Sequence, residues 1–276
     1  MTDAGPIQAA DSNGSAPRLL VVGGVMRGGT TLLRSMLSSH PRVTLFAREL
    51  RALSWCGVSG AVHALAVHQH LWSSGRRIRD SQFRNQVYGY VWRLLRQNGI
   101  FGRVVGVGTV HRVFTACLAN PSSRYVGDKY PDYIFHYPGF IHRADCRSIF
   151  IIRDPLDVVS SILHRIRHGG WLGKGWVRDY ASIEGATAYW VDVATAMADL
   201  LRLDGNALVI RYEDLVLATR PTVEVIAEYL DLPVEGFDTE APRAASIGKH
   251  TQTLNAQEIR EIKQRAATLM ASFGYA

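Results

Sequence analysis

A glycine-rich turn between a short apolar run and a helical pattern restricts the fold of this chain more than any other feature. Residues 18–23 carry a continuous apolar run, which is typical of a parallel strand buried on both faces. The turn occupies residues 23–31, and we expect a helix from Thr30 to about Ser39. Such a turn directs backbone amides inward at a helix N-terminus and therefore suits an anion. Glycines that only ease a strand-to-helix connection would produce the same pattern.

Buried strands and helical patterns alternate along the rest of the chain. Strands are expected at 148–152 and 207–210, and shorter ones at 43–46 and 125–127. Helices are expected at 60–72, 81–97, 178–203, 220–230 and from Asn255 onward. This alternation predicts an α/β fold of the P-loop NTPase-like, three-layer kind, with a central, mainly parallel sheet of about five strands. No linker divides the chain, so we expect a disordered leader at 1–16 and a single domain at 17–276, with a helical insertion at about 50–120.

The turn departs from the ATP-binding P-loop at one position. Gly23, Gly28 and Thr30 fit the template GxxxxGK followed by serine or threonine, but Gly29 stands where the template has lysine. The sequence after the turn has no obvious acidic residue that could bind magnesium. The turn is therefore poorly suited to transfer of the γ-phosphate of ATP. Arg27 supplies a positive charge from inside the loop instead. The net charge of +7 favours an anionic ligand without choosing between nucleotide, nucleic acid and membrane surface.

A second group of candidate binding residues follows the strand at 148–152. Arg153 closes this strand, Asp154 is a good helix N-cap, and Asp157 has the spacing of a capping-box partner. Ser161 lies two turns into the helix. Ligands of open α/β sheets bind beyond the carboxyl ends of the strands. We therefore expect Arg153 and Ser161 at the same rim as the glycine turn, where they can hold a second phosphate.

Together the two segments resemble the sulfotransferases that use 3′-phosphoadenosine 5′-phosphosulfate (PAPS). In that family a Lys/Arg, a small residue and Gly-Thr-Thr bind the 5′-phosphosulfate, and a strand-end arginine with a serine eight residues on binds the 3′-phosphate. Residues 27–32 match the first motif, and Arg153 and Ser161 match the second. Residues 127–131 resemble the D-K-x-P motif of the bacterial and tyrosylprotein-type branches, and 211–215 resemble their Y-E-D-L.

The resemblance implies roles for the matching residues. The residues expected to bind the donor are Arg27, Gly28, Gly29, Thr30, Thr31, Arg153, Ser161 and Lys249. Arg27 would also stabilise the leaving oxygen, and Lys129 would contact the bridging oxygen or the sulfonyl group. Transfer would follow the logic of phosphoryl transfer, with in-line geometry and charge stabilisation, but the family needs no metal.

The acceptor hydroxyl requires a general base. In the tyrosylprotein-type branch this base is a glutamate that follows a His-Pro pair. The nearest match in this sequence is Glu49, whose distance from its His-Pro pair differs from the family's by about one residue. In the cytosolic branch the base is a histidine between the two phosphate motifs, where His111 and His136 lie. We expect Glu49 to be the base and keep a histidine as the alternative.

The expected reaction is sulfuryl transfer to a hydroxyl of a small molecule, glycan or lipid-like metabolite, with no nucleic-acid partner. No apolar run approaches the roughly 18 residues of a membrane span. Scattered Cys56, Cys117 and Cys146, with no C-x-x-C pair, fit a reducing cytoplasm. The alternatives are a P-loop nucleotide or small-molecule kinase and a non-catalytic nucleotide-binding module. The oligomeric state is not indicated by the sequence.

Three other groups of residues are weaker candidates for a functional role. His63 and His70 share a helix face, but no acidic ligand joins them as a metal site would require. The arginines at 76–79 are typical of a solvated face. Trp171 and Trp176, in a glycine-rich loop, are either a mobile lid or anchors to the core.

Overall fold

A five-stranded parallel sheet forms the centre of the molecule. The computed structural model describes residues 16–72, 80–99, 104–169, 171, 174–203, 206–240 and 246–275. The strands run in the order β2–β3–β1–β4–β5. Their bounds are β1 Arg18–Gly24, β2 Val43–Leu45, β3 Tyr125–Lys129, β4 Cys146–Ile152 and β5 Ala207–Arg211. The predicted sheet is confirmed, but β3 is longer than expected and ends at Lys129, because its residues pair with β1 as far as Val22.

Nine α-helices are present in the described part of the chain. Their bounds are α1 Thr30–Ser39, α2 Gly60–Trp72, α3 Ser81–Asn98, α4 Val107–Leu118, α5 Pro155–His168, α6 Ile183–Arg202, α7 Tyr212–Leu217, α8 Thr219–Leu230 and α9 Ala256–Ser272. Shorter 3-10 segments include η1 Ala52–Trp55, η2 Pro131–Gly139 and η3 Gly175–Tyr180. The helix expected from 178 begins instead at Ile183, because the Ser182 side chain caps it by accepting from the Gly185 amide. No helix among the described residues is long and apolar enough to cross a membrane.

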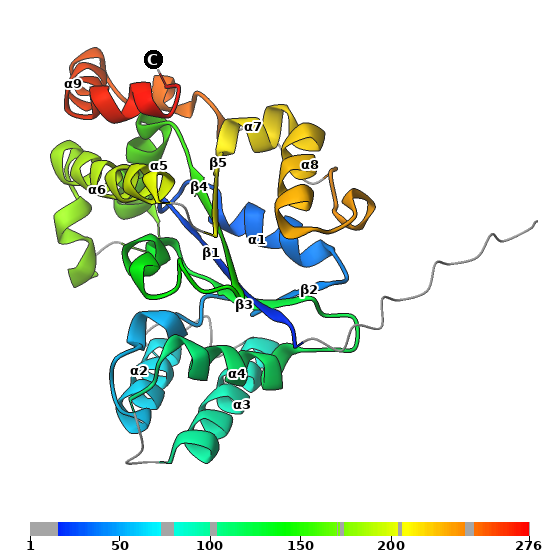
Figure 1. Ribbon diagram of the computed structural model, residues 1–276. Coiled ribbons are helices and arrows are strands. Elements are labelled where there is room, and N and C mark those ends of the chain that lie inside the picture. Colours follow the sequence, from blue (N-terminus) through cyan, green and yellow to red (C-terminus); the bar gives the residue numbers. More distant parts are fainter. Residues whose placement is uncertain are drawn as a thin grey trace, which may run out of the picture.

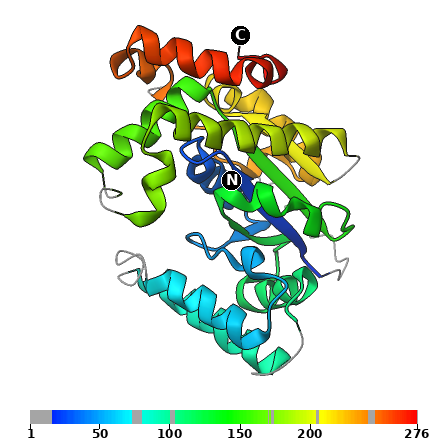
Figure 2. The ribbon, with the colours of Figure 1, turned by 90° about the vertical axis from the view of Figure 1, so that its left-hand side faces the viewer.

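Helices cover both faces of the sheet, which gives the three predicted layers (Figure 1). Alternate residues of a strand point to opposite faces. Leu19 and Val21 therefore enter one core, which α5, α6 and α9 complete, while Leu20 and Val22 enter a second core with α1, α7 and α8. Helices α6 and α9 run beside each other on the first face (Figure 2).

Helices α2, α3 and α4 separate β2 from β3 in sequence and lie together at the end of the molecule away from α9 (Figure 1). His63 of α2 is fully buried there, between the carbonyl of Trp55 (2.8 Å) and the hydroxyl of Tyr90 (2.8 Å). Burial lowers the pKa of His63 to about 4. His63 is thus a core residue, and the described residues contain no cluster of three or more metal-ligating side chains. The leader up to residue 15 and the arginines at 76–79 lie outside the described residues.

Candidate active site

The carboxyl ends of the strands bring the predicted residues to one edge of the sheet. In spatial order, Glu49 follows β2, Lys129 ends β3, the loop 24–29 follows β1 and Arg153 follows β4. Lys129 is in register with Val22 of β1, so the end of β3 lies directly beside the start of the loop. The strand order therefore places a lysine and a glutamate on one side of the loop and an arginine on the other.

The loop itself is a tight turn with a strained arginine. The Gly28 amide donates to the Val25 carbonyl (2.9 Å) and closes the turn. Arg27 has a φ of 66°, in the left-handed region that side chains other than glycine adopt at an energetic cost. Strain of this kind is held in place by surrounding contacts and is common at functional sites.

Helix α1 begins with its amides directed toward the space beyond the sheet edge. Gly29 is its N-cap, with a φ of 98°, and no side chain caps the helix. The first-turn amides are therefore available to an anion. A Cβ on Gly29 would lie 2.4 Å from Cδ2 of Tyr212, so both the backbone angle and the space require glycine. Thr30 is buried in the first turn, whereas Thr31 is exposed.

Three arginines gather on the other side of the loop. Arg27 Nε donates to Ser161 Oγ (3.1 Å), and Arg153 donates to the Arg27 carbonyl (3.3 Å). Burial, together with the charges of Arg165 and Arg153, lowers the pKa of Arg27. The Nε atoms of Arg153 and Arg165 are buried and have no hydrogen-bond partner among the described residues. Clustered cations with unpaired buried donors fit an anionic ligand such as a phosphate.

Asp157 holds the C-terminal segment against this cluster. The prediction that Asp157 completes a capping box is wrong, although Asp154 does cap α5 by accepting from the amide two residues on. The Asp157 carboxylate instead accepts from Arg153 (3.1 Å), from the Gly248 amide (2.9 Å) and from His250 Nδ1 (2.9 Å). Burial tends to raise the pKa of Asp157, but the bonds from His250 and Gly248 and the charge of Arg153 bring it below its ordinary value.

Lys249 lies between the two residues that Asp157 anchors. The side chain is exposed, and among the described residues its ammonium group makes no hydrogen bond or ion pair. Arg153 also donates to the carbonyl of Ser246 in the same segment. The segment therefore lies at the edge of the arginine cluster, and a donor contact by Lys249 stays a prediction.

Glu49 and Lys129 meet on the opposite side of the loop. Lys129 Nζ lies 2.6 Å from Glu49 Oε1, although 80 residues separate them in sequence. The lysine side chain is 6% exposed and the glutamate side chain 24% exposed. The glutamate side chain is thus partly exposed while its cationic partner is buried. A pair of this kind can accept a proton and stabilise negative charge side by side.

Asp128 fixes the turn that carries Glu49. This fully buried carboxylate accepts from the amides of Leu50 (3.1 Å) and Arg51 (2.8 Å) and from the Tyr133 hydroxyl (2.6 Å). Burial raises the pKa of Asp128 to about 6, against the opposing effect of these hydrogen bonds. Asp128 therefore positions Glu49 through the backbone of the two residues that follow it.

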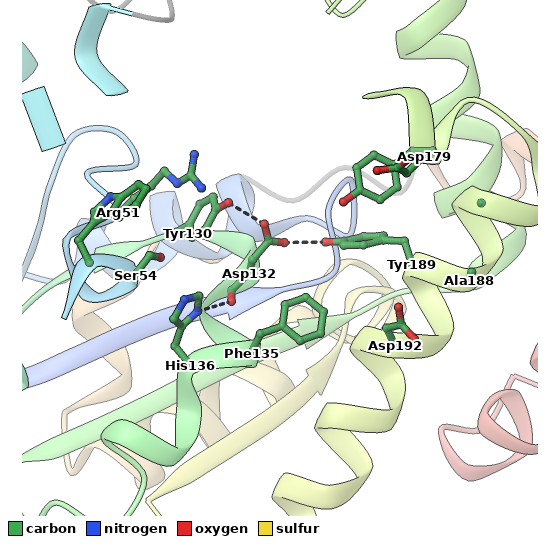
Figure 3. Close-up of a pocket in the computed structure, with 13 residues that line it drawn as sticks. Arg51, Ser54, Tyr130, Asp132, Phe135, His136, Asp179, Ala188, Tyr189 and Asp192 are labelled. Carbon is green, nitrogen blue, oxygen red and sulfur yellow. Dashed lines mark hydrogen bonds between the residues drawn. The ribbon is translucent and has the colours of Figure 1, made fainter. Parts of the chain in front are cut away.

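A cleft of about 650 Å³ opens beside the loop, lined by η1, η2, η3 and α6 (Figure 3). At its base, Asp132 accepts from the hydroxyls of Tyr130 (2.6 Å) and Tyr189 (3.0 Å). The Tyr189 oxygen in turn accepts from the Met26 amide of the loop (3.0 Å). This chain of hydrogen bonds connects the cleft with the loop, so a molecule bound in the cleft would lie close to the loop.

The two candidate histidines lie at opposite edges of the sheet. His136 lines the cleft, and its Nδ1 donates to the Asp132 carbonyl (3.0 Å). His111 contacts the carbonyl of Pro17 (2.8 Å) and the carboxylate of Asp145 (3.2 Å), which precede β1 and β4. His111 is therefore at the amino edge of the sheet, away from the loop, and His136 is the histidine that the structure brings to the site.

The two tryptophans of the glycine-rich segment pack against each other. The rings of Trp171 and Trp176 are 5.1 Å apart, and Trp176 lies 6.5 Å from Tyr180, which lines the cleft. Residues 170, 172 and 173 lie outside the described residues, and a lid over the acceptor stays a prediction.

Comparison with known proteins identifies the family to which the chain belongs. The sequence profile of the sulfotransferase family matches residues 17–236. The chain belongs to the sulfotransferase family. The predicted family resemblance is thereby confirmed, and this sulfotransferase-family chain can be compared with individual relatives.

A curated relative is protein-tyrosine sulfotransferase A of Caenorhabditis elegans, 24% identical over 246 residues, which cover 82% of this chain and 53% of that protein. The chain thus spans about half the length of this relative. Among solved structures, the sulfotransferase domain of the Synechococcus PCC 7002 olefin synthase superposes with a TM-score of 0.58 at 18% identity, over 98% of both chains. The sulfotransferase domain of the curacin biosynthetic pathway gives 0.57 at 18% identity, over 95% of this chain and 99% of that one. These likenesses confirm the P-loop NTPase-like α/β fold.

Several residues of this candidate site could not be identified from the sequence. Arg165 belongs to none of the sequence motifs, although it lies one helical turn after Ser161 and so shares its face of α5. Asp128 was read only as part of a motif, and its link to the Glu49 turn is a contact across 78 residues. The residues that line the cleft, such as Asp132 and Tyr189, are not marked as functional by any local sequence pattern.

Proposed function

We propose that this sulfotransferase-family chain transfers a sulfuryl group from PAPS to an acceptor hydroxyl. The observation that supports the proposal is that two groups of positively charged or amide donors lie at one sheet edge, each of which we propose as an anion site. The loop amides with Arg27 form one site, and Arg153 with Arg165 forms the other, joined by the bond from Arg27 to Ser161 (3.1 Å). A nucleoside that carries a 3′-phosphate and a 5′-phosphosulfate presents two anionic groups to match.

In the proposed reaction, the acceptor oxygen forms a bond to sulfur as the bond from sulfur to the bridging phosphate oxygen breaks. Glu49 takes the proton of the acceptor hydroxyl. Lys129, Arg27 and the amides of α1 stabilise the charge that develops on the leaving oxygen. The products are a sulfate ester and adenosine 3′,5′-bisphosphate. In this proposal these residues supply the positive charge, and the family resemblance implies that no metal ion is needed.

The cleft beside the loop is the proposed acceptor site. It is large enough for a small molecule or a sugar residue of a glycan. His136 lines this cleft and is the second candidate for the base, whereas Glu49 contacts Lys129 directly. A cytoplasmic location and the absence of a nucleic-acid partner remain part of the proposal.

Transfer of ³⁵S from labelled PAPS, in EDTA, to a panel of phenols, alcohols and sugars tests the proposed function. We expect a labelled ester and stoichiometric adenosine 3′,5′-bisphosphate from the wild type, and neither from Arg153→Ala. Release of phosphate or a phosphoryl ester from ATP with magnesium, without sulfuryl transfer, would favour the kinase. Nucleotide binding without any turnover would favour the non-catalytic module.

A further inference from the structure

The cleft carries an excess of negative charge, although the whole chain is positive. Asp132, Asp179 and Asp192 line it, together with Arg51 and His136. In Figure 3, Asp179 and Asp192 lie on the Tyr189 side of the cleft, opposite Arg51. The charge of the cleft lining is therefore opposite in sign to that of the arginine cluster beside the loop.

The two outer carboxylates are available to a ligand. Asp132 is occupied by two tyrosine hydroxyls, but Asp179 and Asp192 are exposed and have no hydrogen-bond or ion-pair partner among the described residues. Burial raises the pKa of Tyr180, and the charges of Asp132, Asp179 and Asp192 raise it further. The Tyr180 hydroxyl in the cleft wall is therefore close enough to all three carboxylates to be affected by their charge.

The cleft walls provide binding features that are independent of these carboxylates. Tyr130, Tyr180 and the half-exposed Phe135 present aromatic surface. The Arg51 guanidinium lies 4.2 Å over the Tyr130 ring and is held at that wall. The indole nitrogen of Trp55 and the hydroxyl of Ser54, both from lining residues, are buried without a hydrogen-bond partner among the described residues. A concave, partly aromatic site with unpaired polar atoms is typical of ligand binding, and aromatic faces attract cations.

We propose that the acceptor is a hydroxyl compound that carries a protonated amine. The amine lies toward Asp179 and Asp192 on the α6 side, and the hydroxyl lies toward Glu49 and Lys129 at the sheet edge. The inference rests on the proposed function, since it takes the cleft as the acceptor site, and it adds the charge class of the acceptor. An anionic acceptor of the same shape meets repulsion from the same carboxylates, so the site selects by charge.

Calorimetric titration of the protein saturated with adenosine 3′,5′-bisphosphate tests this inference. Three phenols share a 4-hydroxyphenylethyl group and differ in the charge of the terminal group: tyramine is a cation, N-acetyltyramine is neutral and 3-(4-hydroxyphenyl)propanoate is an anion. Glucosamine and N-acetylglucosamine repeat the comparison on a sugar. We expect the amines to bind about tenfold more tightly than their neutral partners, and less so in 0.5 M salt. Equal affinities, a preference for the anion, or no binding of either amine would overturn the inference.

The double variant Asp179→Asn/Asp192→Asn keeps the shape of the cleft and removes the two free charges. We expect it to lose the preference for amines while its affinity for adenosine 3′,5′-bisphosphate stays unchanged. Asp199→Asn, on the same helix as Asp192 but outside the cleft, is the control and should keep the preference. Unchanged selectivity in the double variant would contradict the assignment. If the bisphosphate itself fails to bind, the proposed function fails instead, so the two outcomes are separate.

Discussion

At the scale of single residues, the contact between Glu49 and Lys129 joins the two groups that the proposed chemistry needs. The lysine is buried and reaches the glutamate at 2.6 Å, while the glutamate is partly open to solvent. Asp128 accepts hydrogen bonds from two backbone amides in the turn after Glu49. The Glu49 carboxylate is therefore positioned both by this turn and by its contact with Lys129. The role of the glutamate can be separated from donor binding, because Arg153 lies on the other side of the loop.

Glu49→Gln should lower kcat by about 10²–10⁴, the usual contribution of a general base, with affinity for adenosine 3′,5′-bisphosphate unchanged. Steady-state kinetics with PAPS and the best acceptor of the panel, beside calorimetry of the bisphosphate, measure both quantities. Glu184→Gln, at an exposed pair on α6, is the control and should match the wild type. A kcat close to the wild-type value would remove Glu49 from the role, and His136→Asn would then be expected to carry the loss.

Residues that belong to a local motif could be found from the sequence, because a turn or a strand end determines their position. Arg27, Arg153 and Ser161 are of this kind, and the structure brings them together. Asp157 was assigned to a local cap, but its partners Gly248 and His250 are about ninety residues away. Local spacing carries no information on such a contact.

At the scale of elements, the turn from β1 into α1 combines a restricted backbone angle with restricted space. Gly29 has a φ of 98°, and a Cβ there would overlap Tyr212, which also lies under the Arg153 guanidinium at 4.5 Å. A side chain at this position would therefore displace the tyrosine that supports the arginine cluster. Gly57 has the same φ of 98°, but a Cβ there would contact nothing within 4 Å.

Gly29→Ala and Gly57→Ala form a matched pair that separates these two effects. Both should lose about 1 kcal/mol of unfolding free energy from the left-handed backbone angle. Only Gly29→Ala should lose a further 1–3 kcal/mol, by the usual cost of overpacking, together with most of its affinity for adenosine 3′,5′-bisphosphate. Urea unfolding and calorimetry measure the two effects. Equal losses in both variants would show that the contact with Tyr212 does not constrain the loop.

Element boundaries followed the sequence where a cap or a buried run determined them. The capping box at the start of α9, between Asn255 and Glu258, is present as the sequence indicates. The start of α6 was placed too early, because the 3-10 segment at 175–180 shares the helical pattern of residues. The extension of β3 to Lys129 depends on pairing with β1 and could not be read from 125–129 alone.

At the scale of the whole molecule, a neutral histidine is buried among the helices that separate β2 from β3. His63 connects the Trp55 carbonyl with Tyr90 of α3 and is fully buried. Burial sets its pKa at about 4, against about 6.5 in an unfolded chain. The folded state therefore binds fewer protons than the unfolded state between these values, and His63 contributes stability above pH 6.5 that is lost as the pH falls toward 4.

His63→Gln should reduce this pH dependence. The wild type should lose up to about 3 kcal/mol between pH 7 and pH 4 through this residue, so its advantage over the variant should shrink on acidification. Urea unfolding at several pH values measures the difference. His142→Gln, at an exposed position, should leave the curve unchanged. Parallel curves for the wild type and His63→Gln would contradict the assignment.

The fold class could be predicted as a whole, but the acceptor cleft could not. Continuous apolar strands alternating with helices permit few arrangements, and the parallel sheet is one of them. The cleft is assembled from segments between Arg51 and Asp192, whose contact arises only from tertiary packing. Its lining therefore cannot be predicted from any local sequence pattern, and the proposed acceptor class rests on the structure alone.

The central claim is that the loop and the arginine cluster together bind a nucleoside with phosphates at both the 3′ and 5′ positions. Calorimetric titration in EDTA, with adenosine 3′,5′-bisphosphate and with adenosine 5′-monophosphate, tests it most directly. The account predicts that the bisphosphate binds about 100-fold more tightly, and that Arg153→Ala removes most of this difference. Equal affinities for the two nucleotides, or a tighter magnesium-dependent complex with ATP, would contradict it.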